Sequence, residues 1–259
     1  MSEPVLITSR DNPLLKRLRV LAHDNIGYRK YGQVWLEGDH LCKALLARQF
    51  RPGIAVFAES AWPSADPALK RAAAKVCLVP DALMGGLSGL ESPAGMGFVW
   101  DLPAHGGVLP GVPTVVLDRL QDAGNVGSIV RSAAAMGFAQ IVAIKGTAAL
   151  WSPKVVRAGM GAHFALRLVE GLGPDDLKAL QLPILATSSH EGDWLHTMAL
   201  PQPCAWVLGH EGQGVGEGVA ALTTRSVRIA QPGGEESLNV AAAAAICLHA
   251  SACAALPRP

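Results

Sequence analysis

The 259-residue chain is poor in the residues that would point at once to a metal site or a disulfide framework. It has five cysteines, none of them in a C-x-x-C pair. An odd number of isolated cysteines in apolar surroundings is typical of small buried residues in a reducing compartment. Charged residues make up 17% and hydrophobic residues 50%, so a sizeable core is expected and disorder is not.

The sequence also shows no stretch with the pattern expected of a targeting or membrane-spanning segment. The start, MSEPVLITSRDNP, is polar and interrupted by proline, which is not typical of a signal peptide. The apolar stretch at 240–256 contains His249 and Ser251 and predicts a buried core helix, not a membrane span. We therefore expect a cytoplasmic protein with no membrane partner.

Several familiar catalytic motifs are absent. The sequence contains neither G-x-G-x-x-G nor G-x-x-x-x-G-K-[ST], which disfavours a nicotinamide-dependent oxidoreductase and a Walker-type nucleotide site. It has no H-E-x-x-H and no G-x-S-x-G. No carboxylate or histidine cluster has metal-ligand spacing, so we expect no metal.

A linker is predicted at 101–113, which holds three prolines and three glycines. It divides the chain into a domain of 1–105 and a domain of 106–259. The first reads as a small α/β unit, and its predicted elements are a basic helical stretch at about 12–31, helices at 40–50 and 66–74, and strands at 34–39, 54–60 and 75–80.

The second domain alternates short apolar runs with helical patterns. This alternation predicts a mostly parallel sheet with helices on both faces. The expected strands are 114–120, 140–146, 183–189, 205–211 and 226–231, and the expected helices are 125–137, 152–162 and the alanine-rich run from 240.

Three polar, glycine-rich loops follow strands of this sheet, at 187–193, 209–218 and 231–239. Ligands of such sheets bind at the carboxyl ends of the strands. The third loop leads into five alanines, with Ser237 as the expected N-cap and Asn239 within the first turn, where asparagine is a poor helix former. Free N–H groups at such a helix start can hold a ligand.

Three blocks in this order, 120–138, 207–215 and 229–248, resemble the signature motifs of the SpoU-type (TrmH-like) RNA 2′-O-ribose methyltransferases of the SPOUT superfamily. The resemblance covers about 114–256. The residues that match are Asn125 and Arg131 in the first motif, Gly209, Glu211, Gly212 and Gly214 in the second, and Ser237, Leu238 and Asn239 in the third. The N-terminal stretch resembles the small RNA-binding domain that precedes the knotted domain in this family.

The resemblance implies a trefoil-knotted C-terminal domain that transfers a methyl group from S-adenosylmethionine to a ribose 2′-hydroxyl, and a homodimer formed through that domain. The implied catalytic residues are Asn125, Arg131, Glu211, Ser237 and Asn239. The implied cofactor-binding residues are Thr187, Ser188, Leu208, Gly209, His210, Glu211, Gly212, Ile229, Ala230, Pro232, Ser237 and Leu238.

The substrate and several residue roles stay open at this point. We favour ribosomal RNA, with tRNA as the alternative and a non-catalytic RNA-binding protein as a further one. Asn125 could also serve as a helix cap, the glycines and Glu211 as turn residues, and Arg131 as a surface residue. The family assigns a base at the Arg131 position, but a guanidinium is effectively always protonated, so Arg131 could instead hold a phosphate and stabilise an alkoxide.

A basic patch in the N-terminal domain is the expected RNA contact. Residues 1–51 contain nine lysines and arginines and five acidic residues, an excess of four positive charges. A solvated helix face is the alternative explanation of this excess. The predicted RNA-binding residues are Arg10, Lys16, Arg17, Arg29 and Lys30.

Overall fold

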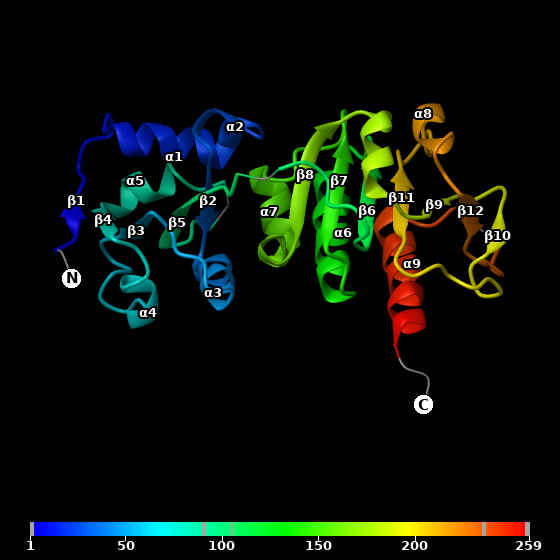
Figure 1. The fold of residues 1–259 in the computed structure, drawn as a ribbon. Coiled ribbons are helices and arrows are strands. Elements are labelled where there is room, and N and C mark those ends of the chain that lie inside the picture. Colours follow the sequence, from blue (N-terminus) through cyan, green and yellow to red (C-terminus); the bar gives the residue numbers. More distant parts are fainter. Residues whose placement is uncertain (1–2, 90–91, 105, 235–236, 257–259) are drawn as a thin grey trace. The chain divides into compact units, whose positions relative to one another are not determined.

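The structure is a computed structural model that describes residues 3–89, 92–104, 106–234 and 237–256. Contacts divide the chain into two compact units (Figure 1). The first comprises Met1–Ala104 with Trp151–Phe164, and the second comprises His105–Leu150 with Ala165–Pro259. The segment Trp151–Phe164 thus packs with the first unit, although it lies within the predicted C-terminal domain.

The first unit is built on a five-stranded mixed sheet in the order β1-β4-β3-β5-β2. Strand β5 runs antiparallel to both of its neighbours, and the remaining pairs are parallel. Its strands are β1 (Val5–Leu6), β2 (Gln33–Glu37), β3 (Ile54–Ala58), β4 (Lys75–Val79) and β5 (Met96–Asp101). Its helices are α1 (Pro13–His23), α2 (Gly27–Tyr31), α3 (Asp39–Ala47), α4 (Pro67–Lys70), α5 (Asp81–Gly85) and α7 (Pro153–Gly159), which the 3₁₀ turn η1 (Ala162–Ala165) follows.

Two features of this unit differ from the sequence-based expectation. The basic stretch at 12–31 is two helices, because the carboxylate of Asp24 accepts a hydrogen bond from the backbone N–H of Ile26 and closes a turn instead of continuing the helix. The sequence did not predict strand β5, because glycines lie at its start and glycine is uncommon in strands. Gly97 is required there, since a Cβ would lie 2.4 Å from ring atoms of Trp35 on the neighbouring strand.

The second unit holds a seven-stranded sheet, all of whose pairs are parallel, in the order β10-β12-β9-β11-β6-β7-β8. The α/β class with a mostly parallel sheet is confirmed. The strands are β6 (Thr114–Asp118), β7 (Gln140–Ile144), β8 (Arg167–Leu172), β9 (Ile184–Thr187), β10 (Asp193–Trp194), β11 (Ala205–Gly209) and β12 (Arg225–Arg228). The helices are α6 (Ala123–Ala135), η2 (Pro174–Leu180), α8 (Glu217–Ala220) and α9 (Val240–Ala255).

Helices cover both faces of this sheet. On one face, Val116 and Val207 pack with Leu177 of η2 and Val219 of α8. Side chains alternate along a strand, so Trp206 points to the opposite face. There its indole N–H donates to the hydroxyl of Ser251 on α9 over 2.8 Å, and α9 packs against α6. The trefoil knot itself stays a prediction.

Helix α9 is less buried than its composition suggests. Its buried residues lie on one side, and they are Ala244, Cys247, Leu248 and Ser251. Ile246, on the other side, is 40% exposed, so the expectation of a buried core helix holds for only one side of α9 in the single chain. Among the helices that the structure describes, none is long and apolar enough to cross a membrane.

Four of the five cysteines are buried, as expected, and Cys253 is exposed. Burial raises the pKa of the Cys247 thiol to about 12, with a smaller contribution from nearby Cys204. A thiol held in this protonated form is a poor nucleophile and a poor metal ligand. Within the described residues, no three His, Cys, Asp or Glu side chains group as a metal site.

Candidate active site

A cavity of about 760 Å³ lies where the three glycine-rich loops meet, at the carboxyl ends of β9, β11 and β12. Its size is typical of small-molecule sites. The predicted cofactor positions that line it are Thr187, Ser188, Gly209, His210, Glu211, Gly212, Ile229, Ser237 and Leu238. Leu208, Ala230 and Pro232 do not line it, although all three are described. Glu235 and Glu236 of the third loop lie outside the described residues.

The side chain of Leu208 is fully buried within β11, so only its backbone could contact a cofactor, and its role stays a prediction. Sequence reasoning in turn missed Gln213 and Gln231, which both line the cavity. The sequence signal that could have identified them is their position inside the blocks 207–215 and 229–248. The side-chain oxygen of Gln231 is buried and has no hydrogen-bond partner among the described residues. It is therefore a free acceptor for a ligand.

The side chain of Asn125 connects the three motif blocks, 120–138, 207–215 and 229–248, through hydrogen bonds. Its side-chain N–H donates to Oε1 of Glu211 over 3.2 Å, and its Oδ1 accepts from the side-chain N–H of Asn239 over 3.0 Å. These three residues come from α6, the loop after β11 and the start of α9. The structure thus brings together three of the five predicted catalytic residues.

The capping roles differ from the sequence-based expectation. Asn239, not Ser237, is the N-cap of α9, and its Oδ1 accepts from the backbone N–H groups of Ala241 and Ala242 over 2.9 and 3.3 Å. Ser237 is exposed and precedes the helix. Asp122, not Asn125, caps α6. Asn239 therefore stabilises the helix start through one atom and contacts Asn125 through the other.

Glu211 is held in its ionised form. Burial raises the pKa of this carboxyl, but hydrogen bonds outweigh that effect and leave the pKa below its ordinary value of 4.5. The donors are the backbone N–H of Glu211 itself, the side chain of Asn125, and the backbone N–H groups of Gln121 and Asp122. Their stabilisation is present above the ordinary pKa and is lost as the pH falls through the lowered one.

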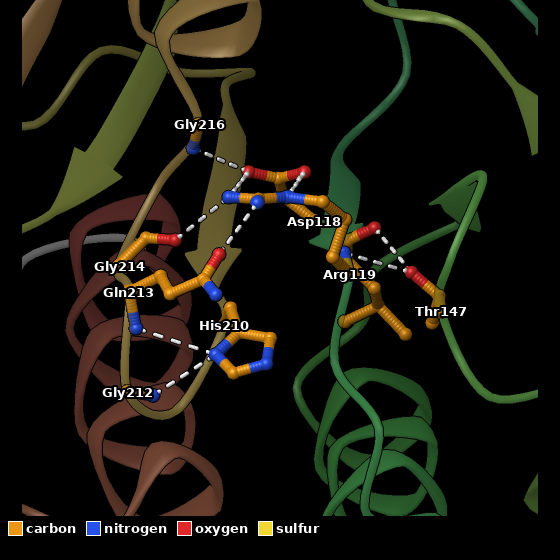
Figure 2. A network of polar contacts seen from close by, with 9 residues as sticks. Asp118, Arg119, Thr147, His210, Gly212, Gln213, Gly214 and Gly216 are labelled. Atoms are coloured by element: carbon orange, nitrogen blue, oxygen red, sulfur yellow. Dashed lines mark hydrogen bonds and ion pairs between the residues drawn. The ribbon is translucent and has the colours of Figure 1, made fainter.

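His210 shapes the second loop. Its Nδ1 accepts from the backbone N–H groups of Gly212 and Gln213 over 3.0 and 3.3 Å (Figure 2). Gly209 allows the loop to close, because a Cβ there would lie 2.3 Å from the carbonyl carbon of Gly214. The resemblance to the family implied both residues, but not these contacts.

Arg131 lies outside this network. It is exposed on α6, six residues after Asn125. Six helical residues advance about 9 Å and about 120° around the axis, so the two side chains point in different directions. Among the described residues the guanidinium of Arg131 has no hydrogen-bond or ion-pair partner. The single chain does not bring it to the cavity.

The predicted RNA-binding residues lie in the first unit and differ in availability. Arg29 and Lys30 are exposed on α2, each over a tyrosine ring. Lys16 pairs with Asp11 over 3.0 Å, and Arg17 is half-buried, with an Nε that has no partner within the described chain. Arg10 is exposed. Arg10, Arg29 and Lys30 are therefore exposed, and Arg17 is the least accessible of the five cations.

Sequence comparison relates the whole chain to methyltransferases. Residues 113–249 match the model of the SpoU rRNA methylase family. The chain is 33% identical over 264 positions to an uncharacterized tRNA/rRNA methyltransferase of Synechocystis sp., covering 96% of this chain and 93% of the relative. It is also 33% identical to the 23S rRNA (guanosine(2553)-2′-O)-methyltransferase RlmP of Bacillus subtilis over 138 residues, 52% of this chain and 56% of that one.

Solved structures agree with this relationship. A TrmH-family protein from Porphyromonas gingivalis superposes with a TM-score of 0.80 at 29% identity, over 93% of this chain and 97% of that one. The fold is also that of AviRb from Streptomyces viridochromogenes, crystallised with S-adenosylmethionine, with a TM-score of 0.83 at 22% identity over 93% and 97% of the two chains. The resemblance seen in the sequence is confirmed: the chain belongs to the SpoU rRNA methylase family.

Proposed function

We propose that the protein is an S-adenosylmethionine-dependent RNA methyltransferase that acts on a ribose 2′-hydroxyl. The observation that carries the proposal is the joining of Asn125, Glu211 and Asn239 at one edge of the cavity. The cavity suits the cofactor: it offers the free acceptor of Gln231, which fits an amino group such as that of adenine. Alanine at Gly212 would meet only the His210 ring, at 3.9 Å, so a ligand can approach the backbone there.

The reaction is an in-line displacement. The ribose oxygen attacks the sulfonium methyl, the carbon–sulfur bond breaks, the sulfur keeps the bonding electrons, and the hydroxyl proton leaves to solvent or a base. The donor methyl is already activated, so the protein has to align the two groups and stabilise the alkoxide that develops. We assign alignment to the three loops and charge stabilisation to Arg131, whose guanidinium stays protonated.

The proposed assembly is a homodimer formed through α9. The exposed residues Ala242, Ile246, His249 and Cys253 form one stripe along this helix, and α9 carries no Asp, Glu, Lys or Arg. A solvent-facing helix normally bears charges on that side, so a second copy of this chain is the expected cover. Because Arg131 lies outside the cavity of its own chain, we infer that each site is completed near the interface.

Replacing Ile246 by glutamate should shift the protein from dimer to monomer, because the change places a charge in the centre of this apolar stripe. Size-exclusion chromatography with light scattering measures the effect. Leu109→Glu is the matched control, since Leu109 is also 40% exposed and lies outside α9. A parent protein that is already monomeric, or an Ile246→Glu protein that stays dimeric, would contradict this arrangement.

We favour ribosomal RNA as the substrate, with tRNA as the alternative, and place the enzyme in the cytoplasm where both RNAs occur. Residues 1–105 are the proposed RNA-binding domain, with Arg10, Lys16, Arg17, Arg29 and Lys30 as the proposed phosphate contacts. Phosphate contacts position RNA without reading its sequence, so selection of the nucleotide would need further contacts.

Arg29→Ala/Lys30→Ala should lower the slope of log affinity against log salt by about 1.4 on single-stranded RNA, about 0.7 for each lost contact. Filter binding at several salt concentrations gives this slope. The control is Lys43→Ala/Lys178→Ala, which removes two lysines that pair with Asp39 and Asp175. Equal slopes for parent and Arg29/Lys30 variant would mean that the RNA binds elsewhere.

The proposed activity is tested by mapping ribose methylation in ribosomal RNA and tRNA from a deletion strain by mass spectrometry. We expect one modification to disappear and to return with the parent gene. Calorimetry adds a second readout, with S-adenosylhomocysteine binding and NAD not binding. An unchanged methylation map together with RNA binding would favour the non-catalytic RNA-binding protein instead.

A further inference from the structure

A second polar network, separate from the Asn125 contacts, joins β6 to the loop after β11 (Figure 2). Asp118, at the end of β6, is 1% exposed, and its Oδ2 accepts from the backbone N–H of Gly216 over 2.6 Å. Arg119 donates to the side chain of Gln213 over 3.0 Å and to the carbonyl oxygen of Gly214 over 3.3 Å. It also pairs with Asp118 over 3.1 Å.

The loop that these residues contact is rich in glycine, and hydrogen bonds of His210 hold only its central part. It contains Gly209, Gly212, Gly214 and Gly216, and Gly214 has a φ of +66°. Glycines lose much conformational freedom when they are ordered, so a ligand that bound a free loop would bear that loss. The same loop lines the cavity.

The chain from the end of β6 to the first turn of α6 contacts this loop at two places. At one, Glu211 accepts a hydrogen bond from the side chain of Asn125 over 3.2 Å. At the other, Asp118 and Arg119 hold Gln213, Gly214 and Gly216. The loop is therefore fixed near both of its ends by one short stretch of chain.

The backbone of Arg119 is itself constrained. Its φ is +62°, which is uncommon for a residue with a side chain. The backbone N–H donates to the hydroxyl of Thr147 over 3.0 Å, and that hydroxyl donates to the carbonyl oxygen of Leu117 over 3.0 Å. This conformation directs the guanidinium towards the loop (Figure 2). Such unusual backbone angles persist where surrounding contacts enforce them and often mark functional positions.

We propose that Asp118 and Arg119 are positioning residues that preorganise the loop 209–216 and thereby tighten the binding of S-adenosylmethionine. The proposal rests on the proposed function, because it takes the cavity as the cofactor site. A loop held in its binding shape before the ligand arrives loses less entropy on binding. The two residues act on the cofactor through the loop.

The test separates the side chain of Arg119 from its backbone angle. Arg119→Gly removes the guanidinium while keeping a residue that adopts a positive φ without strain. We expect it to weaken S-adenosylhomocysteine binding about tenfold, which corresponds to about 1.4 kcal/mol. The KM for the cofactor should rise in parallel, and kcat at saturating cofactor should change little. Arg119→Lys should recover part of the affinity, because an ammonium can still reach one acceptor.

A double-mutant cycle shows whether Gln213 acts through Arg119. Gln213→Ala should weaken binding in the parent, but it should add no further loss in the Arg119→Gly background. If Gln213 contacts the cofactor directly, its effect will be the same in both backgrounds and this part of the proposal falls.

The matched control is Arg167→Ala. Arg167 also donates to backbone carbonyl groups, those of Gly106 and Gly107, but lies away from the cavity. Its loss should leave cofactor affinity unchanged. Melting temperatures without ligand are measured for all variants. An Arg119→Gly protein that binds as tightly as the parent, or whose affinity loss is matched by Arg167→Ala, overturns the proposal. A parent protein that binds no S-adenosylhomocysteine overturns the proposed function as well.

Discussion

Arg131→Ala is expected to slow methyl transfer by about 10²- to 10³-fold, the usual effect of removing one group that stabilises a developing negative charge. Cofactor affinity should stay unchanged, because Arg131 is exposed on α6 and does not line the cavity. The effect should appear in kcat and in kcat/KM alike, since the lost interaction forms only in the transition state.

Single-turnover methylation of RNA and calorimetry with S-adenosylhomocysteine measure the two quantities separately. Arg131→Lys is the informative companion, because it keeps the charge but loses the planar, two-pronged donor set of arginine. Partial activity of Arg131→Lys would indicate that charge dominates, and full loss would indicate that geometry does. If Arg131→Ala keeps most of its turnover, the catalytic assignment of Arg131 is wrong.

Gly209→Ala should lower kcat/KM for the cofactor by about 10²-fold, since displacing a binding loop by about 1 Å can cost that much. The added Cβ would lie 2.3 Å from the carbonyl carbon of Gly214 and 2.4 Å from the backbone nitrogen of Val215. Both are backbone atoms, so no flexible side chain can move aside. The loop must open instead, and the hydrogen bonds between the backbones of His210 and Gly214 should break.

Cofactor titration and a melting curve measure this variant. Gly107→Ala is the control, because nothing lies within 4 Å of a Cβ at that position and its φ is not positive. Gly107→Ala should match the parent in both measurements. A Gly209→Ala protein that binds cofactor normally would show that the close approach of Gly209 to Gly214 is not needed for the site.

The sequence predicted the cavity better than it predicted the contacts within it. The spacing of strands and glycine-rich loops was enough to predict that Ser188, Gly209 and Ile229 lie close together, because parallel strands end at one edge of a sheet. The sequence could not reveal that Asn125 touches Asn239, since this pair depends on how α9 docks. Nor could it show which asparagine or serine caps a helix, because Ser237 and Asn239 are both good caps.

The missed elements have different physical causes. Strand β10 is two residues long and pairs only at the sheet edge, so it leaves almost no periodicity in the sequence. The helix α8 spans four residues after a run of glycines. Asp118 and Arg119 looked like an ordinary strand end, because the partners of their side chains lie almost one hundred residues later in the sequence.

The contact between Asn125 and Asn239 has a consequence for how the protein is made. The ribosome produces α6 well before the chain reaches β12 and the start of α9. The residues that β12 and α9 contribute to the cavity lining are therefore absent during most of synthesis. Pairings between such distant segments form slowly, because a long loop must close before they stabilise anything. A nascent chain that already displays α6 should therefore be unable to retain S-adenosylmethionine, and cofactor capture becomes a late event in the maturation of the enzyme.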